Sequence, residues 1–347
     1  MYELYFTHFT GPHPEKLFTG SSTRHYSVRS VSTRDWRTFS AVRDVTPPGY
    51  VSPDAPVEWR GWSILAYQAY PDKALGGPQS GLFFSRRPAG SAPGGAGWSQ
   101  PRPFLREVLT LPWNRAHRAI DPTLIVDEST GLLHCFFVGS APFGRKRRGA
   151  RANLLGHAMT NDTELKSWVV LTQAQPLIGT SREAPDGVEN VAVFRAAGGG
   201  YAMIYSEGLA SQHLARAISR DLTSWIKLGR LALPGTADAA ATDGDARGRT
   251  TADDDEAGAP SAAAGGVQRW LGARYGAPYV WREPPSGRGG GAAGGCYWMT
   301  LMGESELRTH TSAIGLLSSP DGVHWTLLPE RSRGRVDHAH ANSRATS

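Results

Sequence analysis

The chain has 347 residues, 40% hydrophobic and 10% aromatic, which is enough apolar material for one large core or two ordinary domains. Its 41 glycines and 24 prolines disfavour long helices and favour short strands joined by turns. The net charge is +6, and the lysines and arginines are scattered along the chain except at the basic run 145–148. No aromatic residues that could stack on bases lie within that run, so a nucleic-acid partner is not expected.

Several other classes of protein lack support in the sequence. Two cysteines are too few for a disulfide framework or a structural zinc site, and no His/Cys spacing indicates a metal centre. No Gly-rich phosphate loop and no Gly-x-Ser-x-Gly motif occur, so we expect neither a cofactor nor a metal. No apolar stretch is long enough to cross a membrane, and no signal peptide is visible.

A turn motif repeats about every sixty residues along the chain. It consists of Ser or Thr, usually an Asp two residues later, and then an aromatic residue. We expect the Asp to accept hydrogen bonds from turn amides and the aromatic, Phe39 in the first copy, to pack between adjacent sheets. The five copies lie in the segments 32–39, 85–98, 160–168, 219–225 and 319–325.

Apolar segments with glycine near their midpoints precede four of these turns, which is typical of β-hairpins. These predicted hairpins are 58–69, 123–139, 191–206 and 278–302. Five units of four strands arranged radially would bury both faces of every sheet. The sequence therefore predicts an all-β fold, a five-bladed β-propeller.

The predicted propeller spans residues 1–334 as a single domain. Its blades are expected at about 1–45, 46–108, 109–175, 176–232 and 270–334. The Ala-, Gly- and Asp-rich segment 235–266 reads as a disordered insertion, and 335–347 as a polar tail. The first strand-like run, 2–7, matches the second strand of a blade, so we expect blade one to be incomplete and the chain to be truncated at its N-terminus.

Carboxylates stand at the predicted starts of three innermost strands: Asp54 in blade two, Asp121 in blade three and Glu189 in blade four. Innermost strands converge on the axis of a propeller, so these side chains should meet. A carboxylate beside buried residues is unfavourable unless it is paired or functional. The alternative is that each carboxylate caps its own strand through local backbone amides.

Three of these segments resemble glycoside hydrolase family 43, the arabinanases and xylosidases. Residues 120–131 are similar to the blade-three segment of that family, and 189–206 to the segment that carries its general acid. Residues 52–54 are similar to its Ala-Pro-Asp segment. Asn190 and Val191 depart from the Gly-Pro that usually follows the acid. Related sucrose- and fructan-cleaving propellers share several of these features.

The resemblance implies a secreted, monomeric glycoside hydrolase that cleaves O-glycosidic bonds of oligo- or polysaccharides in an axial pocket. Glu189 would protonate the leaving oxygen, and Asp121 would keep the pKa of that acid high by charge repulsion. The family also needs an opposing carboxylate on the innermost strand of blade one, which either activates water or attacks carbon. No such residue is found in this sequence, so a glycosidase is expected only if that carboxylate lies upstream of Met1. Asp54 of blade two stands beside Glu189 and Asp121 as a catalytic candidate.

Aromatic faces stack on sugar rings, which gives a set of candidate substrate contacts. They are Trp62, Tyr67, Trp113, His117 and Arg274, and core packing or an ordinary surface position is the alternative for each. Two further functions stay open at this point. One is a catalytically inactive, carbohydrate-binding propeller, and the other is a propeller that serves as a protein-interaction platform.

Overall fold

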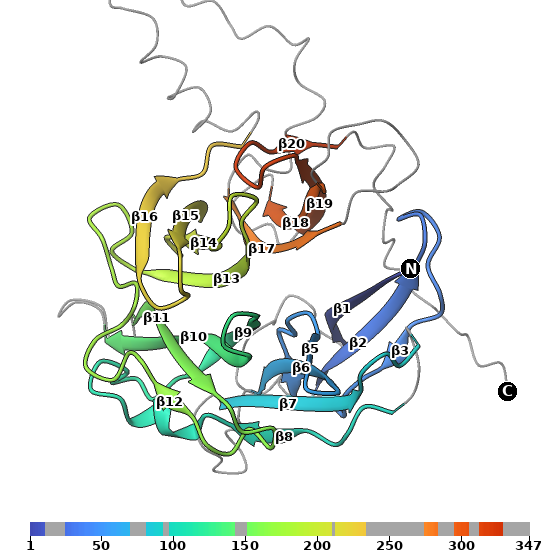
Figure 1. Cartoon of the computed structure of the whole chain (residues 1–347), viewed down its shortest axis with the longest axis horizontal. Coiled ribbons are helices and arrows are strands. Elements are labelled where there is room, and N and C mark those ends of the chain that lie inside the picture. Colours follow the sequence, from blue (N-terminus) through green and yellow to red (C-terminus); the bar gives the residue numbers. More distant parts are fainter. Residues whose placement is uncertain are drawn as a thin grey trace, which may run out of the picture.

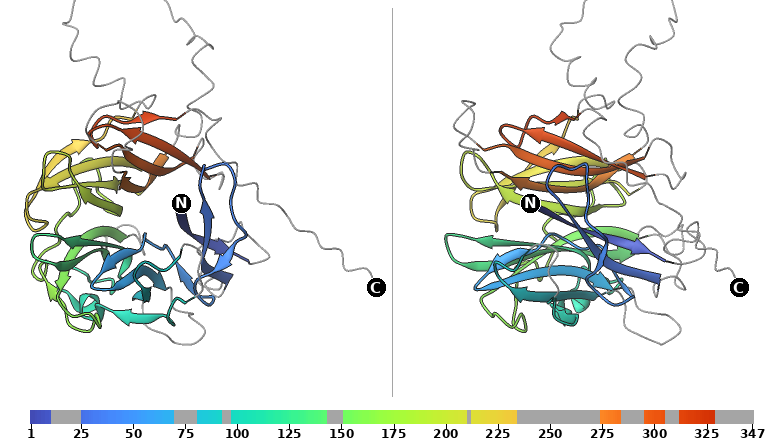
Figure 2. Two further views of the ribbon diagram at one scale, coloured as in Figure 1. Left: turned by 45° about the vertical axis from the view of Figure 1, so that its right-hand side comes forward. Right: turned by 90° about the vertical axis from the view of Figure 1, so that its right-hand side faces the viewer.

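The computed structural model describes residues 1–10, 25–69, 81–92, 97–142, 151–209, 212–233, 274–283, 295–304 and 312–328. These residues form five antiparallel sheets around one axis, which confirms the predicted all-β, five-bladed propeller (Figure 1). The turned views show the sheets packed around the ring (Figure 2). The segments predicted to be an insertion, 235–266, and a polar tail, 335–347, lie outside the described residues.

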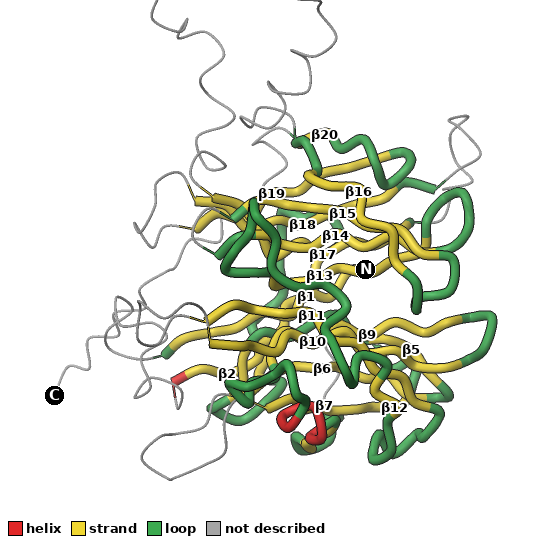
Figure 3. The backbone as a smooth tube through the Cα atoms, turned by 90° about the vertical axis from the view of Figure 1, so that its left-hand side faces the viewer, coloured by secondary structure: helices red, strands yellow, loops and turns green. Residues whose placement is uncertain are grey.

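Strands make up most of the described backbone, and a short 3-10 helix, η4 (Arg106–Thr110), follows blade two (Figure 3). Blade one consists of β1 (Tyr2–Phe9), β2 (Tyr26–Thr33) and β3 (Arg43–Asp44). Blade two consists of β4 (Tyr50–Val51), β5 (Val57–Trp59), β6 (Trp62–Ala69), β7 (Gly81–Pro88) and β8 (Arg102–Phe104). Strands β4 and β5 both pair with β6.

The other three blades have four strands each, in sequence order from the axis outward. Blade three consists of β9 (Ile120–Asp127), β10 (Leu132–Pro142), β11 (Arg151–Thr160) and β12 (Val169–Val170). Blade four consists of β13 (Val188–Arg195), β14 (Tyr201–Glu207), β15 (His213–Ser219) and β16 (Trp225–Arg230). Blade five consists of β17 (Arg274–Arg282), β18 (Tyr297–Glu304), β19 (Ser312–Ser319) and β20 (Thr326–Leu327).

Blade one has three strands, and the repeated turn shows which ones they are. The Asp turn lies between the third and fourth strands of blades three to five, and in blade one it lies between β2 and β3. Strand β1 is therefore the second strand of its blade. Among the described residues no strand pairs with the axial edge of β1, in agreement with the prediction of an incomplete blade one.

The repeated Asp satisfies the amides of its own turn, as predicted. Asp221 Oδ1 accepts hydrogen bonds from the amides of Thr223 and Ser224, both at 2.8 Å. Bonds from the Ser224 and Thr223 amides lower the pKa of Asp221 to about 2, because they stabilise the charged carboxylate. The same pattern recurs at Asp35 and Asp321, so the motif is a structural device for closing the outer strand pair.

The aromatic residue of each turn packs against the preceding blade. Trp225 of blade four meets Phe136 of β10 edge to face, with ring centres 5.8 Å apart. Such pairs add stability beyond the apolar area they bury. Two further ring pairs repeat the arrangement between other blades, namely Trp98 with Tyr5 and Trp168 with Phe104. The turn motif therefore also joins neighbouring sheets.

In blade one the packing aromatic is Trp36, and the prediction of Phe39 was wrong. Trp36 stacks on Trp281 of β17 with ring centres 5.5 Å apart, whereas Phe39 is 37% exposed. The hydroxyl of Thr33 accepts a hydrogen bond from the Trp36 amide, and this tight turn carries the indole towards blade five. Aromatic packing therefore closes the ring between its last and first blades.

Replacing Trp36 by alanine should weaken this closure. We expect Trp36→Ala to lower the free energy of unfolding by about 2 kcal/mol. This is less than the loss expected for a fully buried tryptophan, because Trp36 is half-buried. Phe39→Ala, the matched control on the exposed side of the turn, should change it by less than about 0.5 kcal/mol. Urea denaturation of both variants measures this, and equal losses would contradict the assignment.

Candidate active site

The innermost strands of blades two to five share one backbone distortion near their starts. Four residues have left-handed φ angles of about 50°, and they are Ser52, Asp121, Asn190 and Ala277. In β9, β13 and β17 the pairing register also shifts at this place. Such bulges bend a strand and redirect its side chains, and they are over-represented next to active sites. The predicted carboxylates lie in or beside these distortions.

Two of those carboxylates interact across a blade boundary. Asp121 is the second residue of β9, with its amide hydrogen-bonded to Gln68 Oε1 of β6, and Glu189 is the second residue of β13. Burial and the nearby Glu189 carboxylate raise the pKa of Asp121 to about 7, and Arg118 offsets part of that shift. The predicted convergence of these two residues is therefore present in the structure, on strands that line the centre of the ring (Figure 1).

Glu189 is held by two side-chain amides that sequence reasoning missed. Asn153 Nδ2 of β11 donates to Glu189 Oε2 at 3.0 Å, and Gln212 Nε2, just before β15, donates to Oε1 at 2.8 Å. Both amide side chains are buried, with 1% and 5% of the residue exposed. In the sequence, Asn153 stands out only as a polar residue inside the apolar run 152–155, and this pattern does not predict which residue it binds.

Asp54 joins blade two to blade three. It lies between β4 and β5, where its amide donates to Ala66 O, and its Oδ2 accepts a hydrogen bond from the Leu124 amide of β9 at 2.9 Å. Burial raises the pKa of Asp54 to about 7 despite the bonds from the Leu124 and Ala55 amides. The alternative that Asp54 caps its own strand is thus partly correct. The local Ala55 amide binds this carboxylate, but so does the Leu124 amide of the next blade.

Tyr279 is a third residue that the sequence did not single out. It follows the bulge of β17, keeps 38% of its surface exposed and stacks on Trp281 with ring centres 5.8 Å apart. Surrounding protein and the Asp54 carboxylate raise the pKa of its phenol. Tyr279 of blade five is therefore close enough to Asp54 of blade two for the two side chains to interact electrostatically. A backed, partly exposed ring of this kind can stack on a sugar.

Three of the predicted sugar contacts lie elsewhere. Tyr67 is fully buried with its hydroxyl 2.6 Å from Ser85 Oγ, and Trp113 is buried with its indole donating to Thr172 O at 2.6 Å. Neither ring presents a face to a ligand. Trp62 begins β6 at the hairpin end remote from Asp54, and the Arg86 guanidinium covers its ring at 4.3 Å.

The remaining two predicted contacts lie at or just before the starts of two innermost strands, β9 and β17. His117 is exposed, with a left-handed φ of 51° and its Nδ1 2.8 Å from Leu109 O, one residue before Arg118. Arg274 is the first residue of β17, and its side chain lies outside the described part of the structure. His117 therefore stays a candidate contact, together with Arg274.

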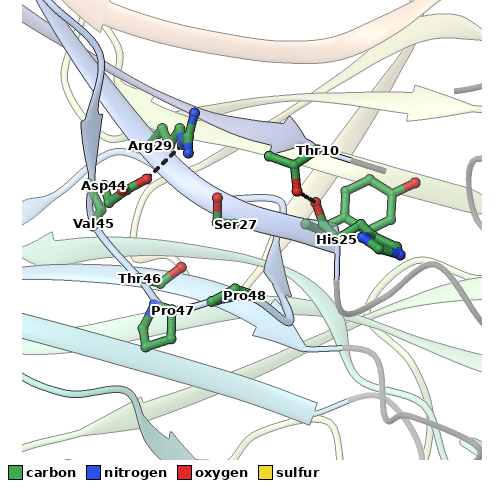
Figure 4. A pocket seen from close by; sticks show the side chains of 10 residues that line it. Thr10, His25, Ser27, Arg29, Asp44, Val45, Thr46, Pro47 and Pro48 are labelled. Atoms are coloured by element: carbon green, nitrogen blue, oxygen red, sulfur yellow. Dashed lines mark hydrogen bonds and ion pairs between the residues drawn. The ribbon is translucent and has the colours of Figure 1, made fainter. Parts of the chain in front are cut away.

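The described residues contain no group of three or more His, Cys, Asp or Glu side chains that could hold a metal ion. No helix in that part of the chain is long and apolar enough to cross a membrane. A cavity of about 420 Å³ lies in blade one, lined among others by His25, Arg29 and Asp44, with Arg29 paired to Asp44 at 2.7 Å (Figure 4). None of the three strand-start carboxylates lines it.

Solved structures share this architecture at low sequence identity. The α-L-arabinanase of Cellvibrio cellulosa is 15% identical with a TM-score of 0.50, and the match covers 88% of this chain and 89% of that one. The xylan β-1,4-xylosidase of Bacillus halodurans is 12% identical with a TM-score of 0.53, over 96% of this chain and 53% of that one. The chain has the propeller fold of glycoside hydrolases.

The resemblance inferred from the sequence is thus confirmed at the level of the fold. A structure from the GH130 family of mannoside phosphorylases, which contains hydrolases of β-1,2 mannosidic linkages in Candida mannan, is 19% identical with a TM-score of 0.39, over 62% of this chain and 50% of that one. The chain spans about half the length of that protein and of the xylosidase. No protein-family model matches the sequence, and neither does any curated protein.

The raised pKa of Asp121 predicts a stability change of definite sign. Its native carboxyl keeps a proton up to about pH 7 and the unfolded one loses it near 3.8, so stability falls as the pH rises through that window. We expect Asp121→Asn to raise the free energy of unfolding at pH 8 by about 1 kcal/mol or more, because asparagine carries no charge and tolerates a positive φ.

The matched control is Asp127→Asn at the other end of β9. Asp127 Oδ1 accepts the Tyr201 hydroxyl at 2.8 Å and its Oδ2 accepts that of Thr130, so this variant should lose stability at the same pH. Denaturant titrations at pH 8 and pH 4 make the comparison. A loss of stability in Asp121→Asn at pH 8 would contradict the unfavourable burial of its charge.

Proposed function

We propose that this protein is a glycoside hydrolase that cleaves O-glycosidic bonds of oligo- or polysaccharides. The observation that carries the proposal is the interaction of Asp121 and Glu189, two carboxylates on β9 and β13, the innermost strands of neighbouring blades. Glycosidases use carboxyl pairs whose environment keeps one member protonated near neutral pH. The shared propeller fold is consistent with this function.

In the proposed reaction the site splits the bond between the anomeric carbon and the glycosidic oxygen. Glu189 gives its proton to the leaving oxygen, and above about pH 7, where Asp121 is ionised, the charge of Asp121 opposes early loss of that proton. Asp54, whose pKa is also raised to about 7, is the candidate for the opposing carboxylate that accepts a proton from water. The water oxygen then bonds to the anomeric carbon, and Glu189 is reprotonated from solvent.

Tyr279 is the proposed platform for the sugar ring. The ring of Tyr279 is partly exposed and stacks on Trp281, and its phenol interacts electrostatically with Asp54. A rigid aromatic ring gains contact with a sugar at little cost in side-chain entropy. The platform and the carboxylates would thus hold and cleave the same residue.

A second candidate function is sugar binding without hydrolysis. It is favoured by one specific observation, the partly exposed ring of Tyr279 backed by Trp281, which could hold a sugar without any reaction. A binding protein would keep the aromatic platform and need no complete set of carboxylates. Hydrolysis assays separate the two functions.

The test of the proposed function is hydrolysis of four aryl glycosides, an arabinofuranoside, a xyloside, a fructoside and a galactoside. At least one should be cleaved, and Glu189→Gln should lower kcat by about 100-fold or more, because general acid catalysis commonly contributes that much. Circular dichroism checks that the variant folds. Undiminished cleavage by Glu189→Gln would refute the assigned acid, and sugar binding without any cleavage would favour the second function.

The aromatic platform makes a separate prediction about binding. Tyr279→Ala should weaken the binding of the cleaved glycoside by about tenfold, equivalent to about 1.4 kcal/mol, while Tyr279→Phe should keep it within about twofold. Calorimetric titration in the Glu189→Gln background measures both without turnover. Equal affinities in all three proteins would remove Tyr279 from the site.

A further inference from the structure

Asn153 connects a charged group to the carboxylate of Glu189. Its Oδ1 accepts a hydrogen bond from Arg118 Nη1 at 3.2 Å and another from Ser140 Oγ at 2.9 Å. Its Nδ2 donates to Glu189 Oε2 at 3.0 Å. The side chain is 1% exposed, so water does not compete for these contacts.

These partners determine which way the Asn153 amide faces. Arg118 is a donor only, so the atom beside it must be the amide oxygen, and the NH₂ group then points at Glu189. The reversed amide would set its NH₂ against a guanidinium and its oxygen against a carboxylate. The orientation of Asn153 is therefore fixed from the side of Arg118.

The backbone of Asn153 also binds the segment just before β13, the strand that carries Glu189. Its amide donates to Asp186 O at 3.0 Å, and Asn153 forms a parallel bridge with Gly187, two residues before Glu189. A Cβ on Gly187 would lie 1.8 Å from Asn153 O, so only glycine permits this approach. Main chain and side chain of Asn153 thus both fix the start of β13.

The second donor to Glu189 is held in a similar way. Gln212 Nε2 donates to Glu189 Oε1, while Tyr275 N of β17 donates to Gln212 O at 3.0 Å. A Cβ on Gly276 would lie 2.5 Å from Gln212 Oε1, so blade five makes room for this amide. Each oxygen of Glu189 therefore receives a hydrogen bond from a fixed amide.

We propose that Asn153 is a positioning residue that orients the Glu189 carboxylate and keeps the Arg118 guanidinium one side chain away from it. Direct pairing with Arg118 would hold Glu189 as a charged carboxylate and oppose proton delivery. With the Asn153 amide in between, Arg118 still fixes the orientation of the group that binds Glu189, but the positive charge does not touch the carboxylate. The catalytic consequence rests on the proposed function, whereas the hydrogen-bond geometry does not.

Asn153→Asp tests the orientation because it changes one side of the contact only. The aspartate keeps an acceptor for Arg118 and Ser140 and replaces the donor facing Glu189 by a second carboxylate oxygen. Glu189→Gln restores a donor and acceptor pair across the same gap. At pH 8 we expect Asn153→Asp to lower the Tm by at least about 3 °C more with Glu189 present than in the Glu189→Gln background.

The control for this cycle is Asn161→Asp. Asn161 Oδ1 also accepts a hydrogen bond from an arginine, Arg60, but on an exposed turn that contacts no residue of the Glu189 site in the described structure. Its Tm shift should be the same in both backgrounds. Equal shifts for Asn153→Asp in both backgrounds would overturn the proposal.

Kinetics on the cleaved aryl glycoside then test the catalytic consequence. A positioning role predicts that Asn153→Asp lowers kcat by about tenfold or more with KM within about twofold, because the loss falls on the transition state. An unchanged kcat would overturn the catalytic part of the proposal. If no glycoside is cleaved, the proposed function fails while the thermal cycle still decides the role of Asn153.

Discussion

The candidate site depends on a backbone distortion that is repeated around the ring. A left-handed residue at the start of four innermost strands interrupts regular pairing, and Asp121 itself adopts this conformation with a φ of 48°. Left-handed φ angles are unfavourable for residues other than glycine, although aspartate and asparagine tolerate them better than most. The surrounding sheets offset that strain and keep carboxylates in places where they are poorly solvated.

The same residue type has opposite properties at two places in a blade. Aspartates of the outer turns, such as Asp221, accept several backbone amides and have a lowered pKa. Asp54 and Asp121 have a raised pKa near 7, because burial outweighs the few hydrogen bonds they receive. The turn aspartates therefore stabilise the fold, and the axial ones lower its stability at neutral pH.

The fold was predictable because its signals repeat. One Asp-aromatic turn is weak evidence, but five copies at regular spacing indicate five blades, and periodic hairpins account for the inner strands. The same logic located Asp121 and Glu189. It failed at Phe39, since two aromatics follow Asp35 and only the three-dimensional turn decides that Trp36 packs against blade five.

The supporting residues of the site could not be predicted in this way. Asn153 and Gln212 reach Glu189 from β11 and from the approach to β15, and neither belongs to a motif. Tyr67 and Trp113 looked like sugar contacts because the sequence does not distinguish an exposed aromatic residue from a buried one. The role proposed for Tyr279 depends on the bulge in β17, which local sequence does not specify.

The central claim is that axial carboxylates are held where their charge is disfavoured. Carbon-13 NMR of the aspartate carboxyl carbons, titrated from pH 3 to pH 9 and assigned with Asp54→Asn and Asp121→Asn, measures this most directly. The account predicts midpoints near pH 7 for Asp54 and Asp121, whereas Asp35 and Asp221, whose pKa is lowered to about 2, should stay ionised over nearly the whole range. Midpoints below about pH 4.5 for both axial residues would contradict it.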